Sequence, residues 1–508
     1  MIHGLKINVL PKQLLNSIEL EWWLALRTMV AVLDKKGGNV APKIIEVLEK
    51  VNAGQVSCFG VATPNAFALQ EKIGKLGITN LASQVGVGFS WSKTHPESKP
   101  ELVQHENATI VFEGRTYSPT SKKPIEEFLA KNPQSNFNAV AEAFLKSTEG
   151  DFSLIMAKEA EIVAARDPVG VQPLYFGEND GFAALASNRK ALWKLGIGEP
   201  QSFPPGHVAV VSQEGFKFKS VKTFAYAEPK MMTMEEAAEN VQKLLEHSVQ
   251  KRTQGLKEVA VAFSGGLDSS VVAFLAKKCG VNVQLVHVSL ENQPETEDAW
   301  KAAEELQLPL TVHLFKEADI EKVIPKVVEL IEEPDPIKAS IGVPFYWTAE
   351  KTAEAKFKVL LAGQGADELF GGYQRYVNEY MLDGDEKVRQ TMYNDVARIH
   401  ESNIERDEKI CSFHDVELRL PFASYQIVEY ALSIPTELKM EKKADSLRKL
   451  VLRKAAENMG LAEFMAKNPK KAVQYSTGIS SALKKLAKKH QATLAEYINE
   501  VFQKQKDA

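Results

Sequence analysis

The chain has 508 residues, a formal net charge of −4 at pH 7 and 44% hydrophobic residues. At about 150 residues per domain, this length predicts two large domains or three smaller ones. The composition excludes a disordered or fibrous chain, and the charge gives no sign of a nucleic acid partner. No apolar run reaches the roughly 18 residues of a membrane span. Three scattered cysteines, Cys58, Cys279 and Cys411, exclude a disulfide framework, so we expect a cytoplasmic protein.

Residues 1–28 are interpreted as an N-terminal extension. The stretch 15–33 is fairly apolar, but Glu19, Glu21 and Arg27 interrupt it and no small-residue cleavage site follows, which argues against a signal peptide. Met29 is an alternative start of the natural chain, and the sequence leaves open whether Met1 or Met29 is used.

Residues 29–226 predict a layered α/β or α+β domain, because short β-branched or aromatic runs alternate with turn residues and helical stretches. Strands are expected at 56–61, 109–113, 153–157, 161–165, 182–186 and 207–211, and helices at 42–51, 125–129 and 138–146.

A linker is expected at 227–234, and a second domain at 235–500, whose first helix starts near Thr233. Apolar strands at 259–263, 283–288 and 311–314 alternate with helices at 269–278 and 297–306. This alternation indicates a parallel sheet. From about residue 385 the pattern is mostly helical.

The segment from Lys439 to His490 carries fourteen lysines and arginines against four acidic residues. Basic helices of this kind contact nucleic acid in some proteins, but a solvated helix face is the favoured interpretation. Part of the charge also suits phosphate chemistry.

The strongest motif is VAVAFSGGLDSS at 259–270, where an apolar strand runs into a glycine turn and then a helix. Such a turn points several N–H groups at one spot, and the helix start adds positive potential, which suits a pyrophosphate. Asp268 fits if Mg²⁺ lies between its carboxylate and the phosphates. The alternative is a plain strand-to-helix turn with polar caps. The predicted phosphate-site residues here are Phe263, Ser264, Gly265, Gly266, Asp268, Ser269 and Ser270.

The second motif is LAGQGADELFGGYQRY at 361–376. Asp367 and Glu368 lie in a glycine-rich turn at the expected carboxyl end of a parallel strand, where open α/β sheets bind ligands. Asp367 is therefore placed to share a Mg²⁺ with Asp268. A surface acidic turn is the alternative for this stretch taken alone.

These motifs resemble known families. The loop 259–270 resembles that of the pyrophosphate-loop ATP pyrophosphatases, and 361–376 resembles the GEGxDExFGGY segment of asparagine synthetases. HDVELRLPF at 414–422 is similar to that family's HGxExRxPF, and PKKAVQYSTG at 469–478 to its PK…Q(F/Y)SxG. The resemblance implies a homodimeric, ATP- and Mg²⁺-dependent ligase with a parallel sheet and a helical tail.

The resemblance also implies roles for individual residues. A lysine in the late segment would stabilise the departing pyrophosphate, with Lys470 preferred and Lys471 as the alternative. Val288 would pack on adenine. Glu417 and Arg419 would help to shape the acceptor side. The implied set is completed by the catalytic residues Gln364, Asp367 and Glu368, the nucleotide-binding Gly363, and Asp268 and Asp367 as metal ligands.

Residues 150–211 are similar to the glutaminase domain of glutamine-hydrolysing asparagine synthetases, an α/β/β/α sandwich of the class-II amidotransferase type. That domain attacks glutamine with an N-terminal cysteine. Here the matching position is Val30, and the internal Cys58 lacks a free α-amine. Glu113 replaces the asparagine of the oxyanion segment, and no Arg-Gly-x-Asp clamp occurs around 91–100. We infer a glutaminase fold without glutaminase activity, serving as a scaffold, dimer surface or regulatory module.

The synthetase motif departs from the family at Gln364, where a glutamate is usual, and at Ala423 and Ser424, which follow Pro421-Phe422. Glutamine cannot accept a proton at neutral pH, so the acceptor substrate is in doubt. The leading expectation is adenylylation of the aspartate side chain and attack by free ammonia. The alternatives are amidation of another carboxylate or carbonyl acceptor, and a non-catalytic nucleotide-binding regulator.

Overall fold

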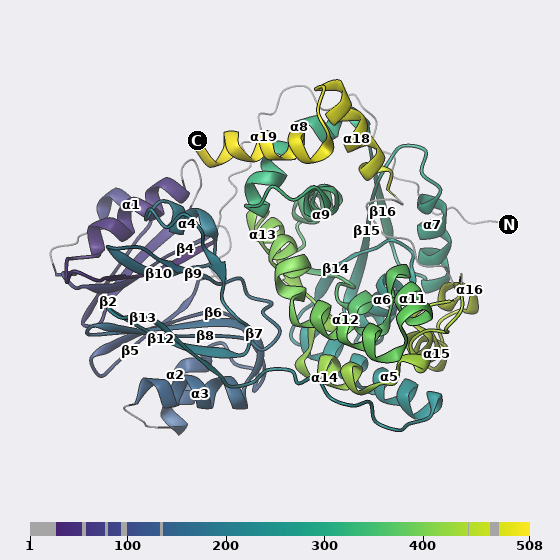
Figure 1. Cartoon of the computed structure of the whole chain (residues 1–508), viewed down its shortest axis with the longest axis horizontal. Helices are drawn as coiled ribbons and strands as arrows, with labels where there is room; N and C mark the ends of the chain where they lie inside the picture. The colour runs from purple at the N-terminus through teal and green to yellow at the C-terminus, as the bar shows by residue number, and fades with distance from the viewer. Residues whose placement is uncertain are drawn as a thin grey trace.

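The structure, a computed structural model, describes residues 27–52, 57–76, 80–92, 99–132, 136–444, 447–467 and 477–507. Two units lie side by side (Figure 1). The first is built from two antiparallel sheets with helices outside them, and the second surrounds a parallel sheet with helices. Among the described residues, no helix combines the length and the apolar character that crossing a membrane requires.

The first sheet of the N-terminal unit has the strand order β11-β9-β10-β1-β4-β2-β3, and the second has the order β13-β12-β8-β7-β6-β5. The strands of the first sheet are β1 (Thr28–Asp34), β2 (Ser57–Thr63), β3 (Ala66–Gln70), β4 (Val85–Ser92), β9 (Tyr175–Glu178), β10 (Phe182–Ala186) and β11 (Gln201–Ser202). Those of the second are β5 (Glu101–His105), β6 (Ala108–Ser118), β7 (Glu149–Lys158), β8 (Glu161–Arg166), β12 (His207–Ser212) and β13 (Gly215–Ser220).

The central strand β1 shows how the layers form. Successive side chains of a strand point to opposite faces, and both faces of β1 are apolar. Ala31 and Leu33 enter the core between the two sheets, while Val30 and Val32 pack under the helices α1 and α4. A third core joins the other sheet to α2 and α3. The helices are α1 (Ala41–Val51), α2 (Pro124–Lys131), α3 (Phe137–Ser147) and α4 (Arg189–Trp193). This confirms the predicted α/β/β/α sandwich.

The C-terminal unit contains a five-stranded, all-parallel sheet of order β16-β15-β14-β17-β18. The chain builds outward from β14 through β15 to β16, and then returns to add β17 on the other side of β14. The strand order therefore reverses between β14 and β17, and open α/β sheets bind their ligands at such a point. The strands are β14 (Glu258–Ala262), β15 (Asn282–Leu290), β16 (Leu310–Phe315), β17 (Val359–Leu361) and β18 (Glu417–Arg419).

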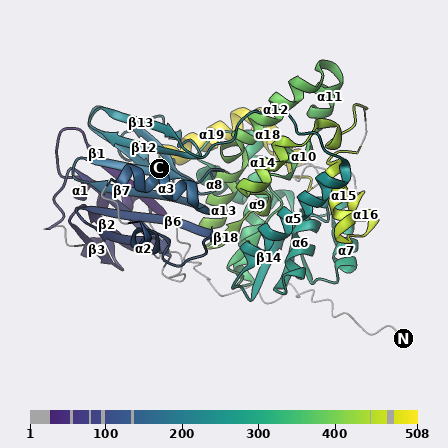
Figure 2. The same ribbon diagram turned by 90° about the horizontal axis from the view of Figure 1, so that it is seen from below.

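Helices cover this sheet, and from about residue 385 onward the described chain is mainly helical, as the sequence predicts (Figures 1 and 2). The first helix of the unit begins where expected, because Thr233 and Glu236 form a reciprocal capping box. The helices are α5 (Met234–Thr253), α6 (Leu267–Lys278), α7 (Glu295–Leu306), α8 (Glu317–Ile331), α9 (Pro336–Glu354), α10 (Ala366–Phe370), α11 (Gln374–Asp383), α12 (Asp385–Ala397), α13 (Glu405–Phe413), α14 (Tyr425–Ser433), α15 (Leu450–Met459), α16 (Glu463–Ala466), α18 (Ile479–Lys489) and α19 (Leu494–Asp507).

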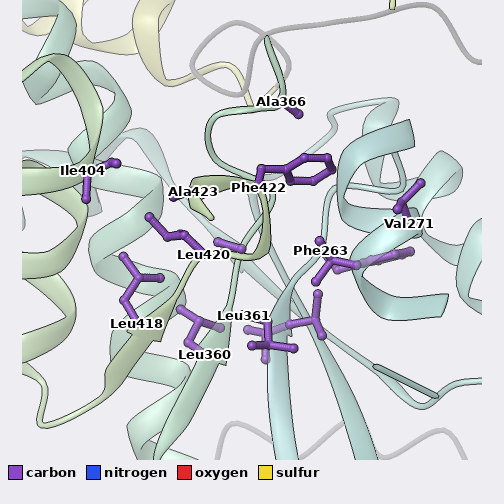
Figure 3. Close-up of a cluster of buried hydrophobic side chains, with 14 of the residues drawn as sticks. Phe263, Val271, Leu360, Leu361, Ala366, Ile404, Leu418, Leu420, Phe422 and Ala423 are labelled. Carbon is purple, nitrogen blue, oxygen red and sulfur yellow. The ribbon is translucent and has the colours of Figure 1, made fainter. Parts of the chain in front are cut away.

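An apolar cluster fixes the carboxyl edge of the parallel sheet. Phe263, just past β14, packs with Leu361 of β17 and Phe422, just past β18, in one buried core (Figure 3). The loops that leave these strands therefore start from a rigid base.

A buried ion pair joins the two units. Glu405, the first residue of α13, accepts hydrogen bonds from Arg166 Nη2 at 3.1 Å, Tyr175 Oη at 2.7 Å and Ser202 Oγ at 2.5 Å. The side chains of Arg166 and Glu405 are 0% and 2% exposed. Burial alone would raise the pKa of Glu405, but the positive charges of Arg166 and Arg189 lower it to about 2.

We predict that Glu405→Gln lowers the free energy of unfolding by about 3 kcal/mol, because it breaks a buried pair and leaves Arg166 without its counter-charge. The folded-state pKa is depressed, so the carboxylate's contribution is present above the unfolded value of about 4.3 and is lost as the pH falls toward 2. Urea unfolding at several pH values should show parent and variant converging below pH 4. The exposed Glu429→Gln is the control, and an equal loss there would contradict the prediction.

Candidate functional site

The loop after β14 is shaped by a close approach to α7. Gly265 has a φ of +74°, and a Cβ at this position would lie 2.8 Å from backbone atoms of Ala299. Ser264 Oγ and Ser269 Oγ are 3.2 Å apart, and Ser264 Oγ also accepts from the N–H of Gly266 at 3.3 Å. Only glycine fits at residue 265, so the tight turn expected from the sequence is present.

Helix α6 starts directly from this loop, with Gly266 as its N-cap and no side chain capping it. The N–H groups at a helix start lack intrahelical partners and favour an anion. The loop therefore presents helix N–H groups and serine hydroxyls on one side, which is the arrangement that a bound phosphate needs. Behind it, His287 Nδ1 lies 2.9 Å from the carbonyl oxygen of Phe263, and burial lowers the pKa of this histidine.

The two predicted metal ligands lie together, and a lysine joins them. Lys449 Nζ lies 2.6 Å from Asp268 Oδ2 and 2.7 Å from Asp367 Oδ1. Its side chain is 1% exposed, whereas each aspartate side chain is 16% exposed. Sequence reasoning assigned Lys449 no role. The only signal was its place within the basic segment, which was interpreted mainly as solvated surface.

The backbone around this cluster is adapted to it. Lys449 itself has a φ of +60°, an uncommon conformation for a residue with a side chain. A Cβ on Gly372 would overlap both Asp367 Oδ1 and Lys449 Cε, and one on Gly363 would lie 2.9 Å from Asp268 Cβ. The glycines of the second motif are thus required by side chains that pack against them.

Further positive charge lies beside the cluster. Arg448 precedes Lys449, and Arg453 follows on α15; burial lowers the pKa of both, while negative charge on Asp367 and Asp268, respectively, opposes this effect. The site therefore combines two carboxylates with cationic groups, a balance suited to a polyphosphate and its metal ion.

Gln364 follows β17 at the same edge and contacts a buried ion pair. Its Nε2 donates to Asp407 Oδ2 at 2.5 Å, and Arg406 Nε donates to Asp407 Oδ1 at 2.7 Å. Arg406 and Asp407 are 2% and 0% exposed. Burial raises the pKa of Asp407, and the guanidinium of Arg406 opposes that shift.

Glu368 is buried on α10, where it accepts hydrogen bonds at 2.6 Å from both Tyr373 Oη and Asn403 Nδ2. Burial, with the negative charge of Asp367, raises its pKa. These partners hold Glu368 in place next to Asp367. Val288, near the end of β15, is also buried. Their predicted catalytic and adenine-binding roles stay predictions.

Glu417 and Arg419 face the boundary between the units. Arg419 Nε donates to Glu417 Oε1 at 2.6 Å, and Arg115 of the N-terminal unit also pairs with Glu417. Arg419 donates in addition to the carbonyl oxygen of Arg252. These contacts balance both charges without a substrate. The predicted substrate-side role of Glu417 and Arg419 stays a prediction.

Lys470 and Lys471 lie outside the described residues. The described chain resumes at Thr477, whose carbonyl oxygen accepts from the N–H of Leu290 at the carboxyl end of β15. Gly478 packs there against Gln293.

The N-terminal unit offers no nucleophile at the predicted position. Val30 is a fully buried residue of β1, paired with Ala186 and Gly88. Cys58 lies in β2 and packs into the core between the sheets.

A small cavity between the units is lined by Glu113, at the position where the resemblance predicts the oxyanion asparagine. Among the described residues, none hydrogen-bonds to its Oε2, and burial and the nearby Glu408 raise the pKa of Glu113 to about 7. None of the residues found to line the cavity is a cysteine; they are Arg27, Glu113, Gln172, Pro173, Ser187, Asn188, Glu408, Lys409 and Ser412.

The donor set of the Asp268–Asp367 cluster fits Mg²⁺. Mg²⁺ prefers oxygen ligands and is commonly held by one or two carboxylates together with substrate phosphates and waters. In the described part of the chain, no group of three or more histidine, cysteine, aspartate or glutamate residues is arranged to hold a metal ion. Such a site would therefore be completed by the phosphates.

The fold and the site define an amidotransferase-like domain joined to an ATP-pyrophosphatase-like domain. Sequence comparison agrees: the profile of asparagine synthase matches residues 240–385 and 378–507, and that of a glutamine amidotransferase domain matches residues 101–194. The chain belongs to the asparagine synthase family and is, by that membership, a carbon–nitrogen ligase.

Individual relatives are distant. A Methanocaldococcus jannaschii protein, provisionally named asparagine synthetase [glutamine-hydrolyzing] 1, is 33% identical over 68% of this chain and 72% of its own length. The asparagine synthetases of Triphysaria versicolor and Gallus gallus are 29% and 28% identical, over 63% and 66% of this chain. The matches span 56% and 64% of their own lengths.

Among solved structures, the glutamine phosphoribosylpyrophosphate amidotransferase of B. subtilis aligns with a TM-score of 0.32 and 15% identity, over 56% of this chain and 65% of that one.

We predict that Lys449→Ala reduces pyrophosphate release from ATP by on the order of 10²–10³-fold, because it removes a positive charge beside the expected phosphate site. The two aspartates would then face each other without the ammonium between them. Steady-state assays with near-ultraviolet circular dichroism, which reports the fold, measure this. Activity within threefold of the parent would contradict the role of Lys449. The control is Lys454→Ala, which removes a half-buried lysine of α15.

We predict that Gly372→Ala causes a loss comparable to that of Lys449→Ala, although it removes no functional group. The added methyl group would displace both Asp367 and Lys449. The control is Gly198→Ala, where the Cβ meets no atom within 4 Å. The same assays apply, and parent-like activity of Gly372→Ala would show that the close packing of this cluster is unnecessary.

Proposed function

We propose that the protein is an ATP-dependent synthetase that adenylylates the side-chain carboxylate of aspartate, releases pyrophosphate, and forms asparagine and AMP with free ammonia. The observation that carries the proposal is the Asp268–Lys449–Asp367 cluster, placed beside the phosphate loop where the sheet changes strand order.

The first half-reaction uses the residues of this edge. The loop from Ser264 and the start of α6 bind the phosphates through N–H and hydroxyl groups, so the α-phosphorus is held in place for attack by the carboxylate. Lys449 stabilises the negative charge that develops on the departing pyrophosphate. Asp268 and Asp367 would hold Mg²⁺, which supplies further charge neutralisation when bound.

The choice of ammonia over glutamine rests on the N-terminal unit. A glutaminase of this type needs a cysteine nucleophile whose own α-amine acts as base. Val30 has no thiol, and Cys58 is an internal strand residue. Glu113 cannot donate to an oxyanion while ionised. These features favour ammonia over glutamine as the nitrogen source.

The test is pyrophosphate release and asparagine formation with ATP, Mg²⁺ and aspartate. We expect both products with ammonium chloride and neither glutamate nor asparagine with glutamine as the only nitrogen source. Asparagine formation from glutamine would refute the loss of glutaminase activity. Aspartate-independent pyrophosphate release with another carboxylic acid would show that the acceptor is different.

A further inference from the structure

The inference concerns the form of the nitrogen nucleophile, and it rests on the proposed function. Gln364 lies between the phosphate loop and α13: its neighbour Gly363 touches Asp268, and its own side chain reaches Asp407. It is therefore at the edge where the acyl group and the nucleophile have to meet.

The buried ion pair determines which end of the Gln364 amide faces the site. A carboxylate only accepts hydrogen bonds, so the NH₂ group of Gln364 has to face Asp407. Asp407 is itself held by two bonds from Arg406, at 2.7 and 3.0 Å, and cannot turn away. The oxygen Oε1 then lies on the opposite side of the amide, and no described residue donates to it.

The same pair leaves the position nearly neutral. The charge of Asp407 is matched by Arg406, and Gln364 has none. An ammonium ion bound at Oε1 gains no counter-charge from these groups, whereas ammonia donates an N–H to Oε1 and keeps its lone pair for attack.

We propose that Asp407 is a positioning residue that presents Gln364 Oε1 as a neutral acceptor, so that the enzyme takes an unprotonated nitrogen nucleophile, ammonia or a neutral amine, and excludes ammonium. In the step itself, the ammonia nitrogen forms a bond to the acyl carbon and the bond from that carbon to the AMP oxygen breaks. AMP carries away the electron pair, and one proton is released to water.

Other charged groups on the elements around this position are the Asp268–Lys449–Asp367 cluster, Glu368 on α10, His400 preceding α13, Glu408 on α13, and the pairs of Arg166 with Glu405 and of Lys409 with Glu332. Burial lowers the pKa of His400 to about 3, so it stays neutral at the pH values used below. The variants leave these groups in place, so a difference in pH profile between the parent and a variant reports on Gln364 and Asp407.

The experiment measures initial rates of amide formation between pH 6.5 and 8.5 for the full chain, with ammonium chloride varied at saturating aspartate. For the parent, kcat/KM for total ammonia should rise about tenfold per pH unit, following the neutral fraction. Asp407→Asn should raise KM for ammonia at least tenfold. The asparagine side chain can donate as well as accept, so it no longer fixes which end of the Gln364 amide faces it. KM for aspartate and aspartate-dependent ATP–pyrophosphate exchange should stay within twofold.

The double variant Gln364→Glu/Asp407→Asn exchanges the two groups, so that residue 364 carries the carboxylate and residue 407 carries the amide. It should flatten the pH profile, because a carboxylate binds ammonium and takes its proton. The control is Asp395→Asn, which removes a carboxylate paired with Arg375 away from Gln364.

Three outcomes overturn the proposal while the proposed function stands: a flat parent profile, an unchanged KM for ammonia in Asp407→Asn, or an equally steep profile in the double variant. Absence of any ammonia-dependent amide in the parent overturns both.

Discussion

One buried ammonium group between two carboxylates determines the form of this site. Lys449 is 1% exposed, so its charge is tolerable only while Asp268 and Asp367 lie within hydrogen-bond distance. That requirement brings together three segments that are distant in the chain: the loop between β14 and α6, the glycine-rich turn after β17, and the residues before α15. It also explains the positive φ of Lys449 and the missing side chain at Gly372.

The parallel sheet makes this meeting possible. β14 and β17 are neighbours although about a hundred residues separate them, and both end at the same edge. Phe263, Leu361 and Phe422 form part of the apolar core beneath that edge (Figure 3). The chemistry is thereby supplied by loops, while the strands and the core fix the loop origins.

Much of this organisation could be predicted from local pattern. Short sequence patterns predict the strands of the first unit and the strand–turn–helix at 259–278. They also predict that Asp268 and Asp367 lie at one site. Lys449 could not be found in this way, because its partner Asp268 is 181 residues away and its surroundings match an ordinary basic helix. Asp407 and Glu405 could not be found for a similar reason: acidic residues in the first turn of a helix are common, and only the fold shows what they contact.

Helix α13 has a consequence for the whole protein. Its first residue, Glu405, accepts hydrogen bonds from the N-terminal unit. Its third residue, Asp407, accepts a hydrogen bond from the Gln364 amide and so orients it. The N-terminal unit therefore stabilises α13, the helix that aligns the Gln364 amide. Removing the N-terminal unit would therefore also remove the contacts of Glu405, and with them the support for the helix that aligns Gln364.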